Sequence, residues 1–236
     1  MEKARLDKII AGEGTYSRRE VRLLVRQGRV LVDGVPARSP EDKVVPEAVE
    51  IMVDGTVLHC RRYTWIMLHK PAGVLSATED GRGATVLDLL PPELRRRGLF
   101  PVGRLDKDTE GLLLLTNEGG LAHDILSPKH HVDKVYYVEV DGRLDQQDRR
   151  AFQAGVTLAD GTVCQPADLT VLDPPSQGLV TLREGKYHQV KRMLAARGKP
   201  VTYLKRLSMG PLTLDPALPA GAWRPLTPEE KASLGR

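Results

Sequence analysis

The sequence has few cysteines and no long apolar run. Its two cysteines, Cys60 and Cys164, lie far apart and outside any CxxC or Cys/His spacing, so neither a disulfide framework nor a zinc site is indicated. Charged residues interrupt the apolar stretches, and nowhere do about 18 uncharged apolar residues follow one another. A signal peptide and a membrane span are therefore not expected, and a reducing cytoplasm is the expected location.

The composition excludes the disordered and fibrous classes. Of the 236 residues, 41% are hydrophobic and 28% are charged, as in ordinary folded proteins. A chain of this length can form one sizeable core and a small accessory domain. The net charge is only +4, but the pI near 9.1 permits a polyanionic partner where basic residues cluster.

The first sixty residues are predicted to form a compact module of two helices and a hairpin. A short apolar stripe ends at Gly12. Ser17 and Glu20 then form a capping-box pattern, which predicts a second helix over residues 18–27. Alternation over residues 30–32 leads into an Asp-Gly pair, a strong signal for a tight turn between strands.

The second helix is expected to present a stripe of arginines. A run of basic side chains on a helix is usually a solvated face. Here only Glu20 offsets five arginines within twelve residues, so phosphates opposite them are the favoured interpretation. The predicted RNA-binding residues of the stripe are Arg18, Arg19, Arg22, Arg26 and Arg29.

The runs RLDKII and SRREVRLLVRQGRVLVDG, within residues 3–50, resemble the S4 RNA-binding domain. The resemblance implies that the arginine stripe binds structured RNA through phosphates, with strong salt dependence. S4 modules also occur in ribosomal proteins, RNA chaperones and synthetases. This part of the chain therefore does not indicate which reaction, if any, the protein catalyses. A non-catalytic RNA-binding or ribosome-assembly protein remains an alternative.

The rest of the chain is predicted to be a second, α+β domain. We expect the first domain at residues 1–58, a linker at 59–63 and the second domain at 64–236. Hairpin-like turns between irregularly alternating elements favour a mixed, mostly antiparallel sheet flanked by helices. The predicted strands are 65–69, 111–116, 135–140, 179–182 and 201–207, and the predicted helical segments are 85–90, 121–125, 145–153, 188–196 and a short capped helix beginning at Thr227.

A loop rich in carboxylates, GRLDKDTEG, leads from Gly103 into the apolar run LLLLT. This places Asp106 at the mouth of a buried strand, where a carboxylate can act as a nucleophile or base. A solvated loop is one alternative. A calcium loop is improbable because Asn117 stands where glutamate is needed, and a glycosidase would require a second carboxylate across the sugar.

The segment GRLDKDTEGLLLLT resembles the active-site motif of the RsuA/RluB family of ribosomal RNA pseudouridine synthases, and Asp106 falls on the family's catalytic aspartate. HKPAG (69–73), KVY (134–136) and EGKYHQVKRM (184–193) resemble three further family segments. The resemblance implies base flipping and isomerisation of uridine without a cofactor or metal. Attack at C6 of the uracil, attack at the sugar C1′ and abstraction of a sugar proton all remain possible for the aspartate.

The resemblance also implies roles for residues around the aspartate. Tyr136 would stack on the flipped uracil and assist proton removal, although a tyrosine in an alternating strand can simply face the core. Lys191 or Arg192 would pair with the aspartate. These neighbours point about 100° apart on a helix, so only one can enter the site; family alignment favours Lys191, with Arg192 facing RNA or solvent. Arg104 and Lys70 are expected to contact RNA.

The segments 127–131 and 221–230 resemble the small-subunit branch of the family. This favours 16S rRNA, or an assembling small-subunit particle, as the substrate, with 23S rRNA as the alternative. No helix carries a stripe that requires a partner helix, so a monomer is expected.

Overall fold

The chain divides into two compact units, which are described separately. The computed structural model describes residues 3–58, 60, 63–81, 83–127 and 132–235. The first unit comprises Met1–Thr64 with Leu90–Phe100, and the second comprises Trp65–Leu89 with Pro101–Arg236. Most of the predicted linker, and residues 128–131 of the small-subunit segment, lie outside the described residues.

The first unit contains helices and two small sheets, one of four strands and one of two. The second helix begins where the sequence predicts: the Ser17 hydroxyl accepts a hydrogen bond from the Glu20 amide, and the Glu20 carboxylate accepts one from the Ser17 amide. Leu6 and Ile10 of the first apolar stripe are fully buried. The elements of this unit are β1 (Ala4–Arg5), α1 (Leu6–Gly12), α2 (Arg18–Arg26), β2 (Val30–Val32), β3 (Val35–Pro36), β4 (Lys43–Val44), η1 (Pro46–Ala48), β5 (Ile51–Val53), β6 (Thr56–Leu58) and α3 (Pro92–Arg95).

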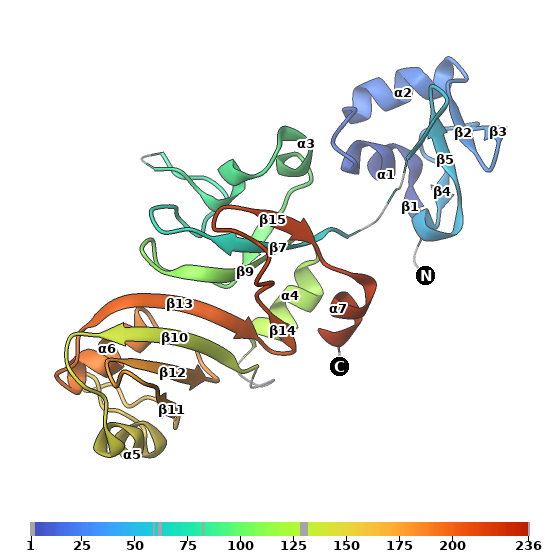
Figure 1. The fold of residues 1–236 in the computed structure, drawn as a ribbon. Coiled ribbons are helices and arrows are strands. Elements are labelled where there is room, and N and C mark those ends of the chain that lie inside the picture. The colour runs from blue at the N-terminus through green and yellow to red at the C-terminus, as the bar shows by residue number, and fades with distance from the viewer. Residues whose placement is uncertain (1–2, 59, 61–62, 82, 128–131, 236) are drawn as a thin grey trace. The chain divides into compact units, whose positions relative to one another are not determined.

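A nine-stranded sheet forms the second unit, and Figure 1 shows its long strands running side by side. The strand order is β11-β12-β10-β13-β9-β7-β15, with β14 beside β13 and β8 beside β9. The strands are β7 (Trp65–Lys70), β8 (Phe100–Val102), β9 (Glu110–Thr116), β10 (Lys134–Val140), β11 (Asp168–Val171), β12 (Gln177–Leu182), β13 (Val201–Met209), β14 (Leu212–Thr213) and β15 (Trp223–Pro225).

The prediction of an α+β fold with a mixed, mostly antiparallel sheet is confirmed. Along the main path of the sheet only β13 and β9 pair in parallel, and the other recorded pairings are antiparallel. The flanking helices are η2 (Val86–Leu89), α4 (Gly119–Leu126), α5 (Gln146–Ala154), α6 (Gln189–Ala196) and α7 (Pro228–Ser233). The first of them is a 3-10 turn where a longer helical segment was expected, and the Thr227 capping box of α7 is present.

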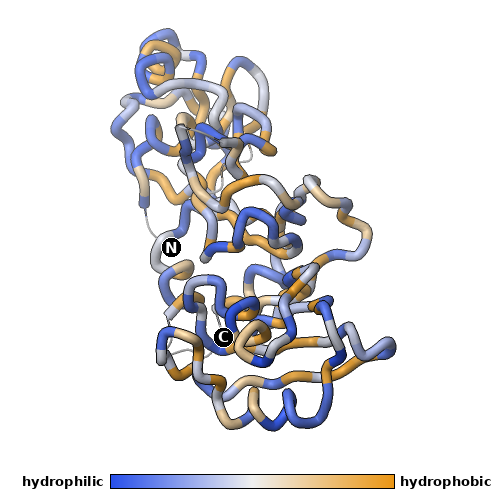
Figure 2. Tube along the Cα trace, turned by 90° about the vertical axis from the view of Figure 1, so that its left-hand side faces the viewer, coloured by the Kyte–Doolittle hydropathy of each residue, from blue (hydrophilic) through white to orange (hydrophobic). Residues whose placement is uncertain are grey.

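The core of the second unit lies along its central strands. β7 is buried at every position, and Leu112–Leu115 of β9 have no exposed surface, as expected for strands covered on both faces. Figure 2 shows hydrophobic stretches, in orange, alternating with hydrophilic ones along the chain. Within the described part of the chain, no helix is long and apolar enough to cross a membrane.

Candidate active site

The loop between β8 and β9 holds Asp106 at the edge of the buried sheet. The residue before Asp106, Leu105, is buried, and its amide and its carbonyl both form hydrogen bonds with the Ser76 hydroxyl. The Leu105 amide donates to Ser76 Oγ (3.0 Å), and Ser76 Oγ donates to the Leu105 carbonyl (2.9 Å). Because this pair fixes the backbone directly before Asp106, the carboxylate projects from a rigid support.

Two glycines of the same segment are required by the backbone. Gly103 has φ +77° and Gly111 has φ +107°, conformations that other residues seldom adopt. A Cβ atom on Gly111 would also lie 2.2 Å from the Arg206 carbonyl oxygen on the neighbouring strand. The glycine at 111 is thus required both by its backbone conformation and by the close approach of β9 and β13.

Lys70 supports this loop from inside the protein. Its side chain is fully buried, and its Nζ donates hydrogen bonds to the carbonyls of Pro71 (3.0 Å), Lys107 (3.1 Å) and Thr109 (2.8 Å). Burial lowers the pKa of Lys70 to about 8, although neighbouring carboxylates oppose the shift. The prediction that Lys70 contacts RNA is therefore corrected: its ammonium lies below the surface, where a phosphate does not reach it.

Two basic side chains from the start of α6 approach Asp106. Lys191 Nζ lies 3.5 Å from Asp106 Oδ2, and His188 Nε2 lies 3.5 Å from Asp106 Oδ1. The carboxylate itself is one-quarter exposed. Lys191 Nζ lies closer, 2.5 Å, to Asp108 Oδ1, and this hydrogen bond is the main cause of the lowered pKa of Asp108. Lys191 therefore bridges two carboxylates.

Arg192 points away from the aspartate, as expected for the next residue on a helix. Its Nη2 lies 2.5 Å from Asp160 Oδ2. The structure thus brings Lys191, and not Arg192, to Asp106. Arg104 is exposed and lines the cavity beside the carboxylate loop.

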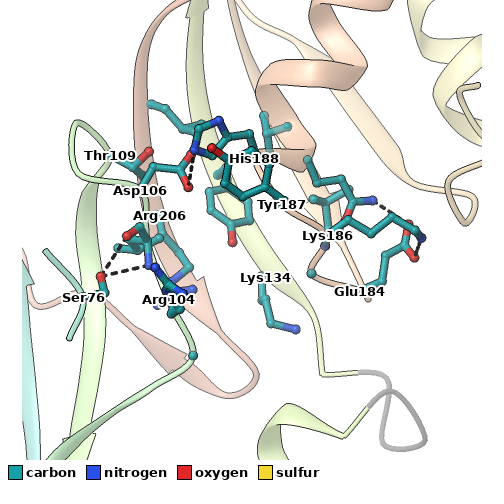
Figure 3. A pocket seen from close by; sticks show the side chains of 18 of the residues that line it. Ser76, Arg104, Asp106, Thr109, Lys134, Glu184, Lys186, Tyr187, His188 and Arg206 are labelled. Carbon is teal, nitrogen blue, oxygen red and sulfur yellow. Dashed lines mark hydrogen bonds and ion pairs between the residues drawn. The ribbon is translucent and has the colours of Figure 1, made fainter. Parts of the chain in front are cut away.

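A cavity of about 710 Å³ opens beside Asp106, large enough for a nucleotide. Figure 3 shows Asp106 and His188 facing each other at this cavity. Tyr136 lines it from β10 with 9% of its surface exposed. Arg206 lies opposite Tyr136 on β13, so the two side chains share the face of the sheet that borders the cavity.

The cavity wall is rich in positive charge. Six Lys and Arg residues line it, against two carboxylates. Arg206 is 2% exposed; its Nε donates to the Leu112 carbonyl (2.8 Å), and its Nη2 has no hydrogen-bond partner among the described residues. Burial lowers the pKa of Lys134, and the positive charge of Arg206 adds to this shift. Such a site favours a ligand with negative charge and oxygen acceptors.

Sequence reasoning missed several of these residues. Ser76, His188 and Arg206 all line the cavity, but none was singled out beforehand. His188 lies inside the quoted segment EGKYHQVKRM, so a signal for it existed. Ser76, in the loop after β7, and Arg206, on β13, reach the site only because segments far apart in the sequence meet in the fold, and the sequence gives no local sign of this.

The arginine stripe in the first unit is partly neutralised by acids from other elements. Arg18 and Arg22 lie 2.9 Å and 3.7 Å from the buried Asp7 carboxylate, and Arg29 pairs with Asp54 at 2.5 Å. All five arginines are exposed. No ion pair is recorded for the two others, Arg19 and Arg26, among the residues described. The charge balance used in the sequence analysis, which counted Glu20 alone, was therefore incomplete.

Comparison with known proteins identifies the class. A family model described as RNA pseudouridylate synthase matches residues 64–196, more than half of the chain, and an S4 domain model matches residues 4–49. The chain belongs to the RNA pseudouridine synthase family and is an isomerase of that class, with an N-terminal S4 domain. Both resemblances drawn from the sequence are confirmed.

Several full-length pseudouridine synthases are similar to this chain. An uncharacterized RNA pseudouridine synthase of Bacillus subtilis is 49% identical, with 96% of each chain covered. The ribosomal small subunit pseudouridine synthases A of Pseudomonas aeruginosa and Escherichia coli are 43% and 41% identical; the alignments cover 98% of this chain and 100% and 99% of theirs. A solved pseudouridylate synthase superimposes with a TM-score of 0.70 at 35% identity, covering 98% of this chain and 99% of that one.

Proposed function

We propose that this protein isomerises one uridine of small-subunit ribosomal RNA to pseudouridine, with Asp106 as the catalytic carboxylate. The observation that supports this best is the position of Asp106: a rigidly supported carboxylate at the rim of a positively charged cavity of nucleotide size. Isomerisation breaks the bond between C1′ and N1, turns the uracil and joins C1′ to C5. The proton on C5 leaves, and N1 gains one.

Each neighbouring residue has a place in this scheme. Lys191 orients Asp106 through its 3.5 Å contact. Tyr136 provides an aromatic wall for the flipped uracil, and its hydroxyl assists removal of the C5 proton. Arg104, at the exposed rim of the cavity, fills the place of the extruded base or binds a phosphate. Arg192 binds the RNA backbone from the outer side of α6.

The S4 domain supplies general affinity for structured RNA. Among its arginines, Arg19 and Arg26 are the residues best able to bind phosphates, because no acid of the described chain is recorded as their partner. Arg18, Arg22 and Arg29 add to this surface while also pairing with acids. The choice of small-subunit RNA rests on the full-length relatives named for that subunit. We expect a monomer acting in the cytoplasm.

Tritium release tests the substrate. Transcripts of 16S and 23S RNA labelled at C5 of uracil, and small-subunit particles at an early stage of assembly, would be incubated with the full-length protein. Release from 16S RNA, naked or in the particle, is the expected result. Release from 23S RNA alone would keep the reaction and overturn the choice of subunit. Release from none of these RNAs would contradict the proposed function.

A further inference from the structure

Tyr187 is an exposed aromatic residue at the rim of the catalytic cavity. The sequence has two Trp, six Tyr and two Phe, all within the described residues, and of these only Tyr187 is largely exposed, at 76%. An aromatic ring left in water loses a large stabilising contribution from burial, so its exposure beside a cavity indicates a binding surface. Figure 3 shows the ring beside His188.

Tyr187 and His188 form a two-ring stack that reaches the catalytic carboxylate. The ring centroids lie 3.8 Å apart with an angle of 18° between the planes. Thus His188 covers one face of the Tyr187 ring, and the high exposure of Tyr187 leaves the other face open. His188 Nε2 in turn lies 3.5 Å from Asp106 Oδ1.

The backbone holds this stack in an unusual conformation. His188 has φ 48° and ψ 35°, a left-handed conformation that residues with a Cβ seldom adopt, and it is the residue directly before α6. Lys191, the second partner of Asp106, lies on the first turn of that helix. The same short segment therefore presents an open aromatic face, a ring against Asp106 and a cation against Asp106.

We propose that the open face of Tyr187 stacks on the nucleobase next to the flipped uridine, and that the His188 ring beneath it positions Asp106. This inference rests on the proposed function, because it places an RNA strand across the cavity. When a uridine leaves its stack, its neighbour loses a stacking partner, and an aromatic side chain can replace it. Stacking tolerates any base, so Tyr187 adds affinity at this position without selecting its sequence.

The test compares Tyr187→Leu with Tyr187→Phe in the full-length protein. Leucine keeps apolar bulk and removes the flat ring, whereas phenylalanine keeps the ring. C5-tritium release from the RNA that the wild type modifies gives kcat/KM. We expect Tyr187→Leu to lower kcat/KM by roughly tenfold or more, and Tyr187→Phe to restore most of it. Val163→Ala, at an exposed residue outside the cavity, controls for surface substitution.

A spectroscopic measurement shows the stack directly. RNA carrying 2-aminopurine on either side of the modified uridine loses fluorescence when that base stacks on an aromatic ring. Binding by the wild type and by Tyr187→Phe should quench one of the two positions, and binding by Tyr187→Leu should not. Equal quenching and equal kcat/KM for Tyr187→Leu and the wild type would overturn the proposed stacking on Tyr187 while leaving the proposed function intact. A wild type that releases no tritium would instead refute the function.

The positioning role of His188 has its own readout. His188→Asn suits the left-handed backbone but lacks the ring, and His188→Gly removes the side chain altogether. We expect both to lower kcat more than they change KM, because neither variant has the ring whose Nε2 lies 3.5 Å from Asp106 Oδ1. A change in KM with kcat unchanged in both variants would overturn the positioning role of His188.

Discussion

Replacing Lys70 with methionine removes the ammonium that joins three backbone carbonyls beneath the Asp106 loop. Methionine nearly keeps the volume of the fully buried side chain but cannot donate a hydrogen bond. Each lost bond to a charged donor costs about 1.5–3 kcal/mol, and relief from burying a charge offsets part of the sum. We expect the free energy of unfolding of the second unit to fall by about 2–4 kcal/mol.

The pH dependence of this difference has a definite sign. The pKa of Lys70 is lowered to about 8 in the folded protein, against about 10.4 in an unfolded chain. Between these values the unfolded state binds more protons, so the contribution of Lys70 to stability rises with pH and is smallest below pH 8. The stability gap between wild type and Lys70→Met should therefore widen, by about 1 kcal/mol from pH 8 to pH 9.

Urea unfolding followed by tryptophan fluorescence measures this effect in the correct unit, because both tryptophans, Trp65 and Trp223, belong to the second unit. Lys107→Met, at an exposed lysine of the same loop, is the matched control and should leave the urea midpoint unchanged. An unchanged midpoint for Lys70→Met together with weakened RNA binding would refute the reasoning, because it would mean that Lys70 contacts RNA after all.

Four further substitutions test other contacts. Arg26→Ala should weaken RNA binding at low salt and reduce the slope of log K against log salt concentration by about 1. Filter binding between roughly 50 and 200 mM salt measures this slope. An unchanged slope would mean that Arg26 does not contact RNA phosphates. Asp108→Asn removes the 2.5 Å ion pair with Lys191 and should keep or raise kcat. Lys191→Met should lower kcat by about tenfold or more in tritium-release assays. Equal losses of kcat in the two variants would show that the reaction needs the ion pair between Lys191 and Asp108. Gly111→Ala should lower the free energy of unfolding by about 3 kcal/mol or more, because its Cβ would lie 2.2 Å from the Arg206 carbonyl oxygen. The measurement is a thermal unfolding curve, in which Tm should fall. A wild-type Tm would contradict the close approach of β9 and β13.

Much of the fold could be predicted from local sequence signals. The capping boxes at Ser17 and Thr227 are present, because each depends only on residues within one turn. The main strands of the sheet were found because apolar runs between turn residues leave few alternatives. The short strands β8, β11, β14 and β15 were missed, since they are brief and gain their place by pairing with longer neighbours.

The site was predictable where one segment defines it and unpredictable where distant segments meet. The Asp106 loop was recognised from its own residues. Lys70 ends a strand, and nothing near it in sequence shows that the carbonyls of Lys107 and Thr109 surround its ammonium. The pairing of Arg29 with Asp54 likewise depends on the pairing of β2 with β5, which brings the residue before β2 next to the turn after β5. Such long-range contacts leave no periodic pattern in the sequence.

The most direct test of the central claim is tritium release by Asp106→Asn. Asparagine keeps the shape of the side chain but cannot serve as a nucleophile or base at this position. Asp141→Asn, at an exposed acid outside the cavity, is the matched control. We expect Asp106→Asn to bind the RNA substrate with wild-type affinity and to release no tritium, while Asp141→Asn releases it at the wild-type rate. Release by Asp106→Asn at the wild-type rate would contradict the assignment of Asp106 as the catalytic carboxylate.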